Sequence, residues 1–315
     1  MNRAVSAYLA YLEARGFSLS SRESSSYALE WLIIFLRERY AVADWRAVTE
    51  AQLDGFRLHL REHRTRKGKP LKEATINRLH CVVRSFFQWQ HRRGRLIYNP
   101  AERQTPSKFE YPLPHVLNER DITRLIEMPD IETAIGLRDR ALMEVLYATG
   151  IRHAEAHGLD LYDADTSARR LTIREGKGKR DRIVPLTENA AHWLTKYLSV
   201  ARPELSGGQR RKGTRRPAPQ LASPALWLAR TGKRLSYSWI EQIIKGYAAE
   251  AEVKANVHTF RHCCATHLLR HGASIRHIQK LLGHGNLHAT QIYLHLDTSD
   301  LARAVARLPQ PSVKP

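Results

Sequence analysis

VHTFRHCCATHLLRHG, Val257 to Gly272, is the stretch of sequence that most decides the fold of the C-terminal half of this chain. Its apolar residues recur at helical spacing, which predicts a helix with one buried side. These residues are Ala265, Leu268 and Leu269. His258 and Arg261 stand three positions apart near the expected start of the helix, so both lie on one face of it. This face is the first candidate for a functional site.

The same stretch also contains a pattern close to that of a zinc-binding helix. His267 and His271 are separated by four positions, and Cys263 and Cys264 are adjacent. The zinc pattern is incomplete, however, because no glutamate follows His267. Adjacent cysteines on a helix point about 100° apart and do not easily share one tetrahedral ion. We therefore expect no metal and no cofactor, and we interpret the cysteines as small core residues.

Two further clusters flank this helix along the chain. In TGIRHAEAHGL, Thr149 to Leu159, Arg152 and Glu155 stand three positions apart, a spacing at which a carboxylate can hold a guanidinium in place. An ordinary surface ion pair is the alternative. In GHGNLHATQIYLHLD, Gly283 to Asp297, His284 is followed nine positions later by Tyr293. The alternative for this tyrosine is core packing with a partner for its hydroxyl.

Taken together, the three clusters supply a set of groups suited to phosphodiester chemistry. Two arginines offer planar forks for the oxygens of a phosphate. A tyrosine offers an attacking oxygen, and the product would be a stable aryl phosphodiester. The sequence contains no glycine-rich phosphate-binding loop with the required spacing before a helix. A nucleophilic mechanism without ATP is therefore favoured.

Composition points to a polyanionic partner. The 315 residues include 51 Lys and Arg against 31 Asp and Glu, for a formal net charge of +20. The excess is spread along the chain, with 19 basic and 10 acidic residues in 1–105 and 32 and 21 in the remainder. Such a charge favours DNA or RNA through phosphate neutralisation. No signal peptide or membrane-spanning apolar run is found, and three cysteines do not make a disulfide framework, so a reducing cytoplasm is expected.

The N-terminal part is predicted to be a helical bundle. Apolar periodicity indicates helices over Asn2–Arg15, Ser20–Tyr40, Glu50–Glu62 and Glu73–Arg93. Ser20 with Glu23 has capping-box spacing, and Thr49 is expected to cap the third helix. The most basic loop, RTRKGKPLK, offers Arg64, Arg66, Lys67 and Lys69 as candidate contacts to a DNA backbone, with a solvated turn as the alternative.

A proline-rich segment, 99–114, is expected to link this bundle to a mixed second part. Two short strands, Leu171–Glu175 and Arg182–Leu186, are predicted to form a hairpin around GKGKRD, and Ala225–Ala229 is a further candidate strand. The fold class is therefore mainly α with a small β-hairpin or sheet. The remaining helices are expected over Asn118–Met128, Leu137–Thr149, Tyr237–Ala251, Thr259–His271, Ile275–Leu282 and Ala289–Leu294, with a last one over Ser299–Leu308.

The motifs in this order resemble those of the tyrosine recombinases, also called the phage integrase family, and most closely its compact Xer-type bacterial members. TGIRHAE is similar to the family's arginine box, which implies that Arg152 binds the scissile phosphate and Glu155 supports it. GKGKRDRIVPL is similar to the hairpin whose lysine enters the minor groove. This points to Lys177, with Lys179 and Arg180 as neighbouring DNA contacts.

The other two motifs of the family fall on the remaining clusters. HTFRH matches the His-x-x-Arg box, which implies catalytic roles for His258 and Arg261. LLGHGNLHATQIYLH matches the region of the last histidine and the nucleophile, hence His284 and Tyr293. The resemblance covers nearly the whole chain. It implies an N-terminal core-binding domain over 1–98, a linker over 99–114 and a catalytic domain over 115–315, with an exchange helix at about 299–308.

The resemblance implies a site-specific recombinase that cuts and rejoins double-stranded DNA through a 3′-phosphotyrosine and a Holliday junction. Its partners would be a specific DNA site and three neighbours in a tetramer on DNA, with or without a second recombinase. Neither a membrane nor a cofactor is implied, and the expected location is the bacterial cytoplasm at the nucleoid. Two alternatives stay open, namely DNA relaxation by a type IB topoisomerase and a catalytically silent DNA-binding accessory protein.

The chain departs from the family pattern at a few positions. His153 follows Arg152 where a small apolar residue is usual, and His288 replaces a common serine near the start of the nucleophile helix. Neither change removes a catalytic group. The basic segment Ser206–Ala225 is longer than in the simplest members, and the sequence assigns it either an extra DNA or partner contact or no ordered role.

Overall fold

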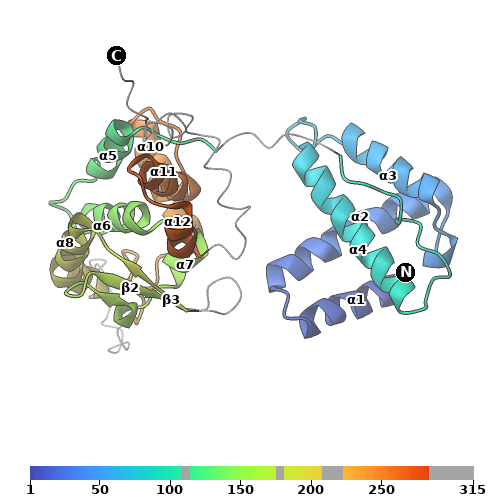
Figure 1. Ribbon diagram of the computed structural model, residues 1–315, viewed down its shortest axis with the longest axis horizontal. Coiled ribbons are helices and arrows are strands. Elements are labelled where there is room, and N and C mark those ends of the chain that lie inside the picture. Colours follow the sequence, from blue (N-terminus) through green and yellow to red (C-terminus); the bar gives the residue numbers. More distant parts are fainter. Residues whose placement is uncertain (108–113, 175–180, 208–222, 284–315) are drawn as a thin grey trace, which may run out of the picture. The chain divides into compact units, whose positions relative to one another are not determined.

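The computed structural model describes residues 1–107, 114–174, 181–207 and 223–283. It divides into two compact units, Met1–Tyr111 and Pro112–Pro315 (Figure 1). The described parts are mostly helical, with one small sheet, which confirms the fold class predicted from the sequence. None of the described helices is long and apolar enough to cross a membrane.

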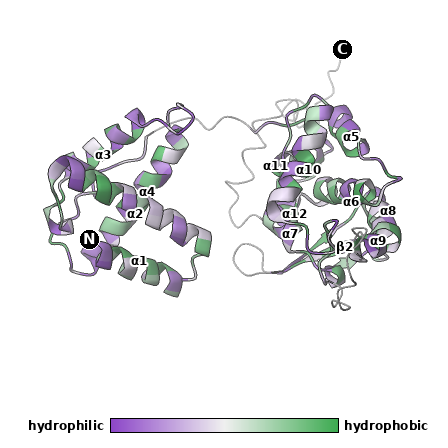
Figure 2. Cartoon of the chain, turned by 180° about the vertical axis from the view of Figure 1, so that it is seen from behind, coloured by the Kyte–Doolittle hydropathy of each residue, from purple (hydrophilic) through white to green (hydrophobic). Residues whose placement is uncertain are grey.

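The first unit is a bundle of four helices around an aromatic core. Along these helices hydrophilic and hydrophobic residues alternate, as amphipathic helices require (Figure 2). Tyr8, Trp45, Phe86 and Phe87 are buried against one another, with ring centroids about 5 Å apart, for example 4.7 Å between Trp45 and Phe86. The elements are α1 (Asn2–Ala14), α2 (Leu19–Tyr40), the 3-10 turn η1 (Trp45–Ala47), α3 (Glu50–Glu62) and α4 (Glu73–Arg92).

The N-termini of α2 and α3 test the two caps predicted from the sequence. Thr49 caps α3 as predicted, and its hydroxyl accepts a hydrogen bond from the Gln52 N–H at 3.3 Å while Gln52 Oε1 accepts one from the Thr49 N–H at 3.0 Å. The predicted Ser20 box is wrong. The cap of α2 is Ser18, whose extended backbone stops the helix and whose hydroxyl accepts from the Ser21 N–H. Ser20 therefore lies within the first turn.

The chain leaving α4 remains attached to the first unit through Ser107. Asn77 on α4 makes two hydrogen bonds to the backbone of Ser107, each 2.9 Å long. Gln104 donates to Asp54 at 2.9 Å, and Arg57 donates to the carbonyl of Thr105 at 2.9 Å. The described part of the segment 99–114 thus follows the surface of α3 and α4. The domain bounds 1–98, 99–114 and 115–315 remain a proposal.

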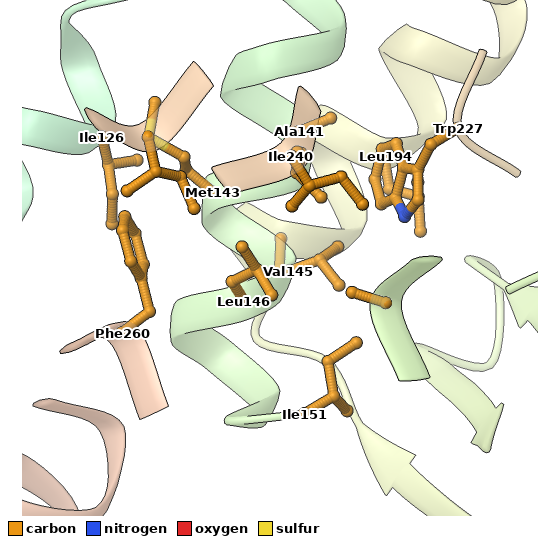
Figure 3. Packing of buried hydrophobic residues seen from close by; sticks show 14 of the residues in the cluster. Ile126, Ala141, Met143, Val145, Leu146, Ile151, Leu194, Trp227, Ile240 and Phe260 are labelled. Atoms are coloured by element: carbon orange, nitrogen blue, oxygen red, sulfur yellow. The ribbon is translucent and has the colours of Figure 1, made fainter. Parts of the chain in front are cut away.

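The second unit is built around α6 (Ala134–Thr149), which is buried on nearly all sides. Figure 3 shows its residues Met143, Val145 and Leu146 between side chains from several other elements. The surrounding helices are α5 (Glu119–Glu127), α7 (His153–Gly158), α8 (Glu188–Lys196), α9 (Arg202–Ser206), α10 (Tyr237–Glu250), α11 (Val257–Arg270) and α12 (Ile275–Leu282). A 3-10 turn η2 (Leu161–Asp163) and a π-helical turn η3 (Tyr197–Ala201) complete them.

The small sheet of the second unit has three antiparallel strands in the order β1-β2-β3. These are β1 (Ala164–Asp165), β2 (Arg170–Ile173) and β3 (Arg182–Pro185). Leu171 pairs with Val184, and both are fully buried against the helices. The predicted hairpin is confirmed for its strands, while its turn, 175–180, lies outside the described residues.

The segment 225–229 was also predicted as a strand, and this prediction is wrong. The Leu226 N–H donates to the carbonyl of Leu159, whereas the carbonyl of Trp227 accepts from the N–H of Leu235. The segment changes its hydrogen-bond partner after one residue, so only isolated bridges form. No ladder is long enough to make a strand there.

Candidate active site

The turn between α6 and α7 brings the first motif into the site. α6 ends at Thr149 and is capped by Gly150, which has φ of +57°. A Cβ atom on Gly150 would lie 2.6 Å from Leu282 Cδ2 on α12. Only glycine meets both requirements, the left-handed backbone and the close approach. The Thr149–Arg152 turn therefore lies directly against the end of α12.

Arg152 and Glu155 form a pair at the start of α7. Arg152 Nη1 donates to Glu155 Oε1 at 2.8 Å, and the Arg152 backbone N–H donates to Oε2 at 2.8 Å. The helix begins at His153, so Arg152 occupies the capping position rather than the first turn. The pair expected at helical spacing is present, and it also closes the N-terminus of α7.

Glu155 has a second arginine partner, which was not among the residues predicted from the motifs. Arg182, at the start of β3, donates through Nη1 and Nη2 to both oxygens of Glu155, at 2.9 and 2.7 Å. Burial alone would raise the pKa of the Glu155 carboxyl, but hydrogen bonds from Arg182 and Arg152 outweigh it and lower the pKa to about 2. The carboxylate is ionised at every ordinary pH.

A sequence signal for Arg182 does exist. In RIVPL the buried residues are Val184 and Leu186, so the period of two places Arg182 on the same inward side of the strand. An arginine directed inward requires a partner, because burying an unpaired charge is costly. The alternation in β3 therefore indicated a buried ion pair.

Arg261 comes from the first turns of α11 and is 5% exposed. Asn256 caps the helix in a reciprocal arrangement with Thr259, which fixes where the helix starts and hence where Arg261 lies. Arg261 Nη1 donates to the carbonyl of Gly150 at 2.5 Å, and Nη2 donates to the carbonyl of Leu282 at 2.9 Å. The second arginine thus ties the α6–α7 turn to the end of α12.

Three arginines meet at the C-terminus of α12. The last carbonyls of a helix have no partner within it. Here Arg182 Nε donates to Leu281 O at 3.3 Å, Arg261 to Leu282 O, and Arg152 Nη2 to Gly283 O at 2.8 Å. Figure 1 shows α7, α11 and α12 side by side in this part of the unit. The structure therefore brings together three of the candidate site residues, Arg152, Glu155 and Arg261.

The histidines around the site differ in exposure. His258, in the first turn of α11, is exposed. Burial, together with the neighbouring His258 and Arg261, lowers the pKa of His262 to about 4. His153, which departs from the family pattern, is buried and stacks on Tyr237 with ring centroids 3.5 Å apart, and its Nε2 lies 2.8 Å from the Tyr237 carbonyl. This residue therefore has a packing role.

The residues of the zinc-like pattern are hydrogen-bonded within the protein or buried. His267 hydrogen-bonds through both ring nitrogens: Nδ1 lies 2.9 Å from Tyr147 Oη, and Nε2 lies 2.9 Å from the Leu117 carbonyl oxygen. Cys263 and Cys264 are buried, and burial raises the pKa of their thiols to about 11 and about 12. Within the described residues no group of three or more metal-binding side chains is found. The interpretation of the cysteines as core residues is confirmed.

Several predicted residues lie outside the described ranges. These are Lys177, Lys179, Arg180, His284 and Tyr293. Gly283, the residue before His284, lies at the centre of the arginine cluster and has φ of +63°. In the first unit, Arg64, Arg66, Lys67 and Lys69 lie on a tight turn between α3 and α4, closed by hydrogen bonds between Thr65 and Lys69. Their contact with DNA stays a prediction.

Comparison with known proteins agrees with this arrangement. Residues 115–300 match the phage integrase family, and residues 5–94 match the phage integrase N-terminal SAM-like domain. The chain belongs to the phage integrase family. It is similar to tyrosine recombinase XerC 2 of Ralstonia nicotianae, 33% identical over 96% of this chain and 84% of the relative. It is also similar to tyrosine recombinase XerC of Pelotomaculum thermopropionicum, 35% identical over 98% of this chain and 97% of the relative.

Solved structures of phage integrase family members share the fold. The XerH site-specific recombinase, bound to a palindromic difH substrate in a post-cleavage complex, is 20% identical with a TM-score of 0.71, covering 93% of this chain and 81% of that one. A dimer of residues 75–356 of lambda integrase, bound to a COC′ core site, is 14% identical with a TM-score of 0.68. The match covers 100% of this chain and 99% of that one. As a family member, the chain is a tyrosine recombinase of the Xer type, an enzyme that cleaves and rejoins DNA through a tyrosine intermediate.

Proposed function

We propose that this chain recombines DNA at a specific site, with Arg152 and Arg261 as the clamp on the scissile phosphate and Tyr293 as the nucleophile. One observation carries the proposal most strongly. Two arginines more than 100 residues apart in the chain converge on the carbonyls of Leu282 and Gly283, directly before His284. A pair of planar guanidinium groups held in this way suits the nonbridging oxygens of a phosphodiester.

In the proposed reaction, Tyr293 loses its hydroxyl proton to solvent, its oxygen attacks the phosphorus, and the bond to the 5′-oxygen breaks. The products are a 3′-phosphotyrosine and a free 5′-hydroxyl. Lys177 delivers the proton that the leaving 5′-oxygen needs, while His258 and His284 hydrogen-bond the phosphate. Because the bond energy is conserved in the phosphotyrosine, a 5′-hydroxyl from a partner strand reverses the step, and ATP is not required.

DNA contacts outside the site are proposed for two basic segments. The turn with Arg64, Arg66, Lys67 and Lys69 offers four cations for backbone phosphates. Lys179 and Arg180 add two more beside Lys177. These contacts position the duplex and are expected to be largely independent of base sequence.

The proposed assembly is a tetramer on DNA, formed by four copies of this chain or together with a second recombinase, in the bacterial cytoplasm at the nucleoid. Its basis is the family and the apolar face of the expected last helix, with Leu301, Val305 and Leu308. Truncation after Thr298 is expected to preserve binding to a single half-site and to abolish cooperative assembly of two sites, measured by native gel shift. Unchanged recombination by the truncated protein would rule out this role of the helix.

The test of the function is to map covalent protein–DNA junctions on genomic DNA of the source bacterium. Wild-type protein is incubated with fragmented DNA, adducts are trapped by denaturant, and the blocked 3′ ends are sequenced. Recombination at a specific site predicts one or a few recurrent junctions, absent with Tyr293→Phe. Junctions spread evenly over the genome would favour a topoisomerase, and the absence of any junction would favour the silent accessory protein.

A further inference from the structure

Arg182 has contacts that the proposed chemistry does not by itself require. Its side chain is 15% exposed, and all three of its nitrogens donate hydrogen bonds. Two of them form a fork on the Glu155 carboxylate, and the third reaches the carbonyl of Leu281. A forked arginine–carboxylate pair fixes the plane of the carboxylate as well as its position.

The Glu155 carboxylate is fully engaged by these contacts. Oε1 accepts from Arg152 Nη1 and Arg182 Nη1, and Oε2 accepts from the Arg152 N–H and Arg182 Nη2. Four hydrogen bonds account for the usual capacity of a carboxylate. Arg152 therefore meets a partner whose orientation Arg182 determines.

Arg182 also lies against the residue that leads to His284. A Cβ atom on Gly283 would lie 2.9 Å from both Cζ and Nε of Arg182. The guanidinium plane is thus packed directly on the backbone of Gly283, whose carbonyl accepts from Arg152. One side chain contacts the carboxylate that holds Arg152 and the backbone that Arg152 itself binds.

We propose that Arg182 is a positioning residue, which aims the guanidinium of Arg152 at the scissile phosphate by fixing Glu155 and the end of α12. This role of Arg182 rests on the proposed function, since it concerns the same site. Arg182 itself does not touch DNA in this account. Because β3 follows the segment with Lys177 directly, Arg182 also joins that segment to the Arg152 turn and to the chain entering His284.

The test compares Arg182→Met with Arg170→Met. Arg170 is a matched control, since it lies on β2 of the same sheet and pairs with Asp165, but its side chain is 53% exposed. The rate of adduct formation is measured on a nicked DNA carrying the target site, and affinity for the intact half-site is measured separately. Misplacing a reacting group by about 1 Å can cost on the order of 100-fold in rate, and we expect Arg182→Met to be slower by about that factor. Half-site affinity is expected to remain unchanged, and the control to match wild type in both.

A neutral substrate separates positioning from simple damage to the fold. With a methylphosphonate at the scissile position, one charged nonbridging oxygen is gone, so the need for the Arg152 clamp is reduced. We expect the deficit of Arg182→Met relative to wild type to shrink at least tenfold on this substrate, as it should for Arg152→Ala. The double variant is expected to be no slower than Arg152→Ala on ordinary DNA, because both changes remove one function.

Three results would overturn the proposal. The first is adduct formation by Arg182→Met at the wild-type rate, and the second is an equal deficit on both substrates. The third is a double variant whose two deficits multiply. If Arg182→Met does not fold, Arg182→Lys is tested in its place, with the same comparison of adduct-formation rates on the two substrates. We expect its rate to lie between those of wild type and Arg152→Ala, because one ammonium cannot form the fork. Absence of any adduct with the wild-type protein would instead contradict the proposed function.

Discussion

At the scale of single residues, Arg152 and Arg261 are oriented by hydrogen bonds within the protein. Arg152 is held by Glu155 and by the carbonyl of Gly283, and Arg261 by the carbonyls of Gly150 and Leu282. Each hydrogen bond uses one donor of a rigid planar fork and so fixes the direction of the others. A site oriented in advance needs little reorganisation in the transition state.

The first prediction follows from the geometry of this fork. Arg152→Lys and Arg261→Lys keep the charge but remove the paired donors. We expect each to slow adduct formation by about 10²–10³-fold, the usual cost of removing one transition-state donor. Half-site affinity is expected to change little. Arg124→Lys on α5 is the control, because this guanidinium bonds the Ala251 carbonyl and Asp121 and is not among the candidate site residues. Near-normal cleavage by either variant would remove that arginine from the site.

The second prediction concerns the proton for the leaving oxygen. Lys177→Ala should cleave ordinary DNA very slowly, while Lys179→Ala should be only mildly affected. Replacing the leaving 5′-oxygen by sulfur makes protonation unnecessary, since a thiol has a pKa of about 8.5 and leaves readily as the thiolate. Cleavage by Lys177→Ala should then recover, and cleavage by Arg261→Ala should not. Rescue of Lys179→Ala instead would place the acid two residues later.

At the scale of elements, the decisive feature is the end of α12. Its last carbonyls accept hydrogen bonds from arginines on α11, on β3 and in the turn before α7. Three segments of the chain therefore contact one helix end. The left-handed glycine at its C-cap allows Arg182 to lie against the backbone. The same contacts therefore fix both the end of the helix and the geometry of the candidate site.

The third prediction tests this helix end. Gly283→Ala places a residue with a Cβ in the left-handed region, which costs about 1–2 kcal/mol of stability. The new Cβ would also lie against the Arg182 side chain. We expect a lower melting temperature together with slower adduct formation. Gly246→Ala on α10 is the control, since a Cβ there meets nothing within 4 Å and a mid-helix alanine should stabilise by about 0.5–1 kcal/mol. A Gly283→Ala protein as stable and active as wild type would contradict the close packing.

The elements were predictable to different degrees. Helices with one apolar face, such as α3 and α4, follow directly from periodicity, and the capping residue Thr49 adds to the signal for α3. The helix α8 and the turns after it, 188–206, were not predicted, although Ala190, Leu194 and Ala201 recur at helical spacing and are buried. The segment 225–229 is apolar enough for a strand, but its partners are set by tertiary contacts that a local pattern does not contain.

Candidate residues for the site follow from the sequence, but the contacts between them do not. Arg152, Glu155, His258 and Arg261 follow from spacing within short motifs. The hydrogen bonds from the arginines to the end of α12 join segments up to 131 positions apart, and no local spacing specifies them. Arg182 was missed for the same reason, although the alternation in β3 indicated a buried arginine.

At the scale of the whole molecule, the charge of +20 is spread over both units of the chain. A protein with this balance gains affinity for DNA by releasing counterions from the phosphates. The described residues of the candidate site all lie in the second unit. The first unit is therefore expected to contribute affinity and placement on the duplex.

The fourth prediction measures this contribution. Half-site affinity should fall steeply with salt, and the double variant Arg66→Gln/Lys67→Gln should reduce the slope of log K against log salt by about 0.9 for each phosphate that the protein no longer neutralises. Adduct formation at saturating protein should be unaffected. Lys245→Gln on α10, which pairs with Glu241, is the control and should leave the slope unchanged. An unaltered slope in the double variant would exclude this turn from the DNA surface.

The central claim is that Tyr293 becomes covalently joined to the 3′ end of the cleaved strand. The direct measurement is to trap the adduct on a nicked target site, digest it with nuclease and protease, and locate the attached nucleotide by mass spectrometry. We predict a single modified peptide, with the nucleotide on Tyr293, and no adduct from Tyr293→Phe although this variant binds DNA normally. A nucleotide on any other residue, or an adduct that persists in Tyr293→Phe, would contradict the claim.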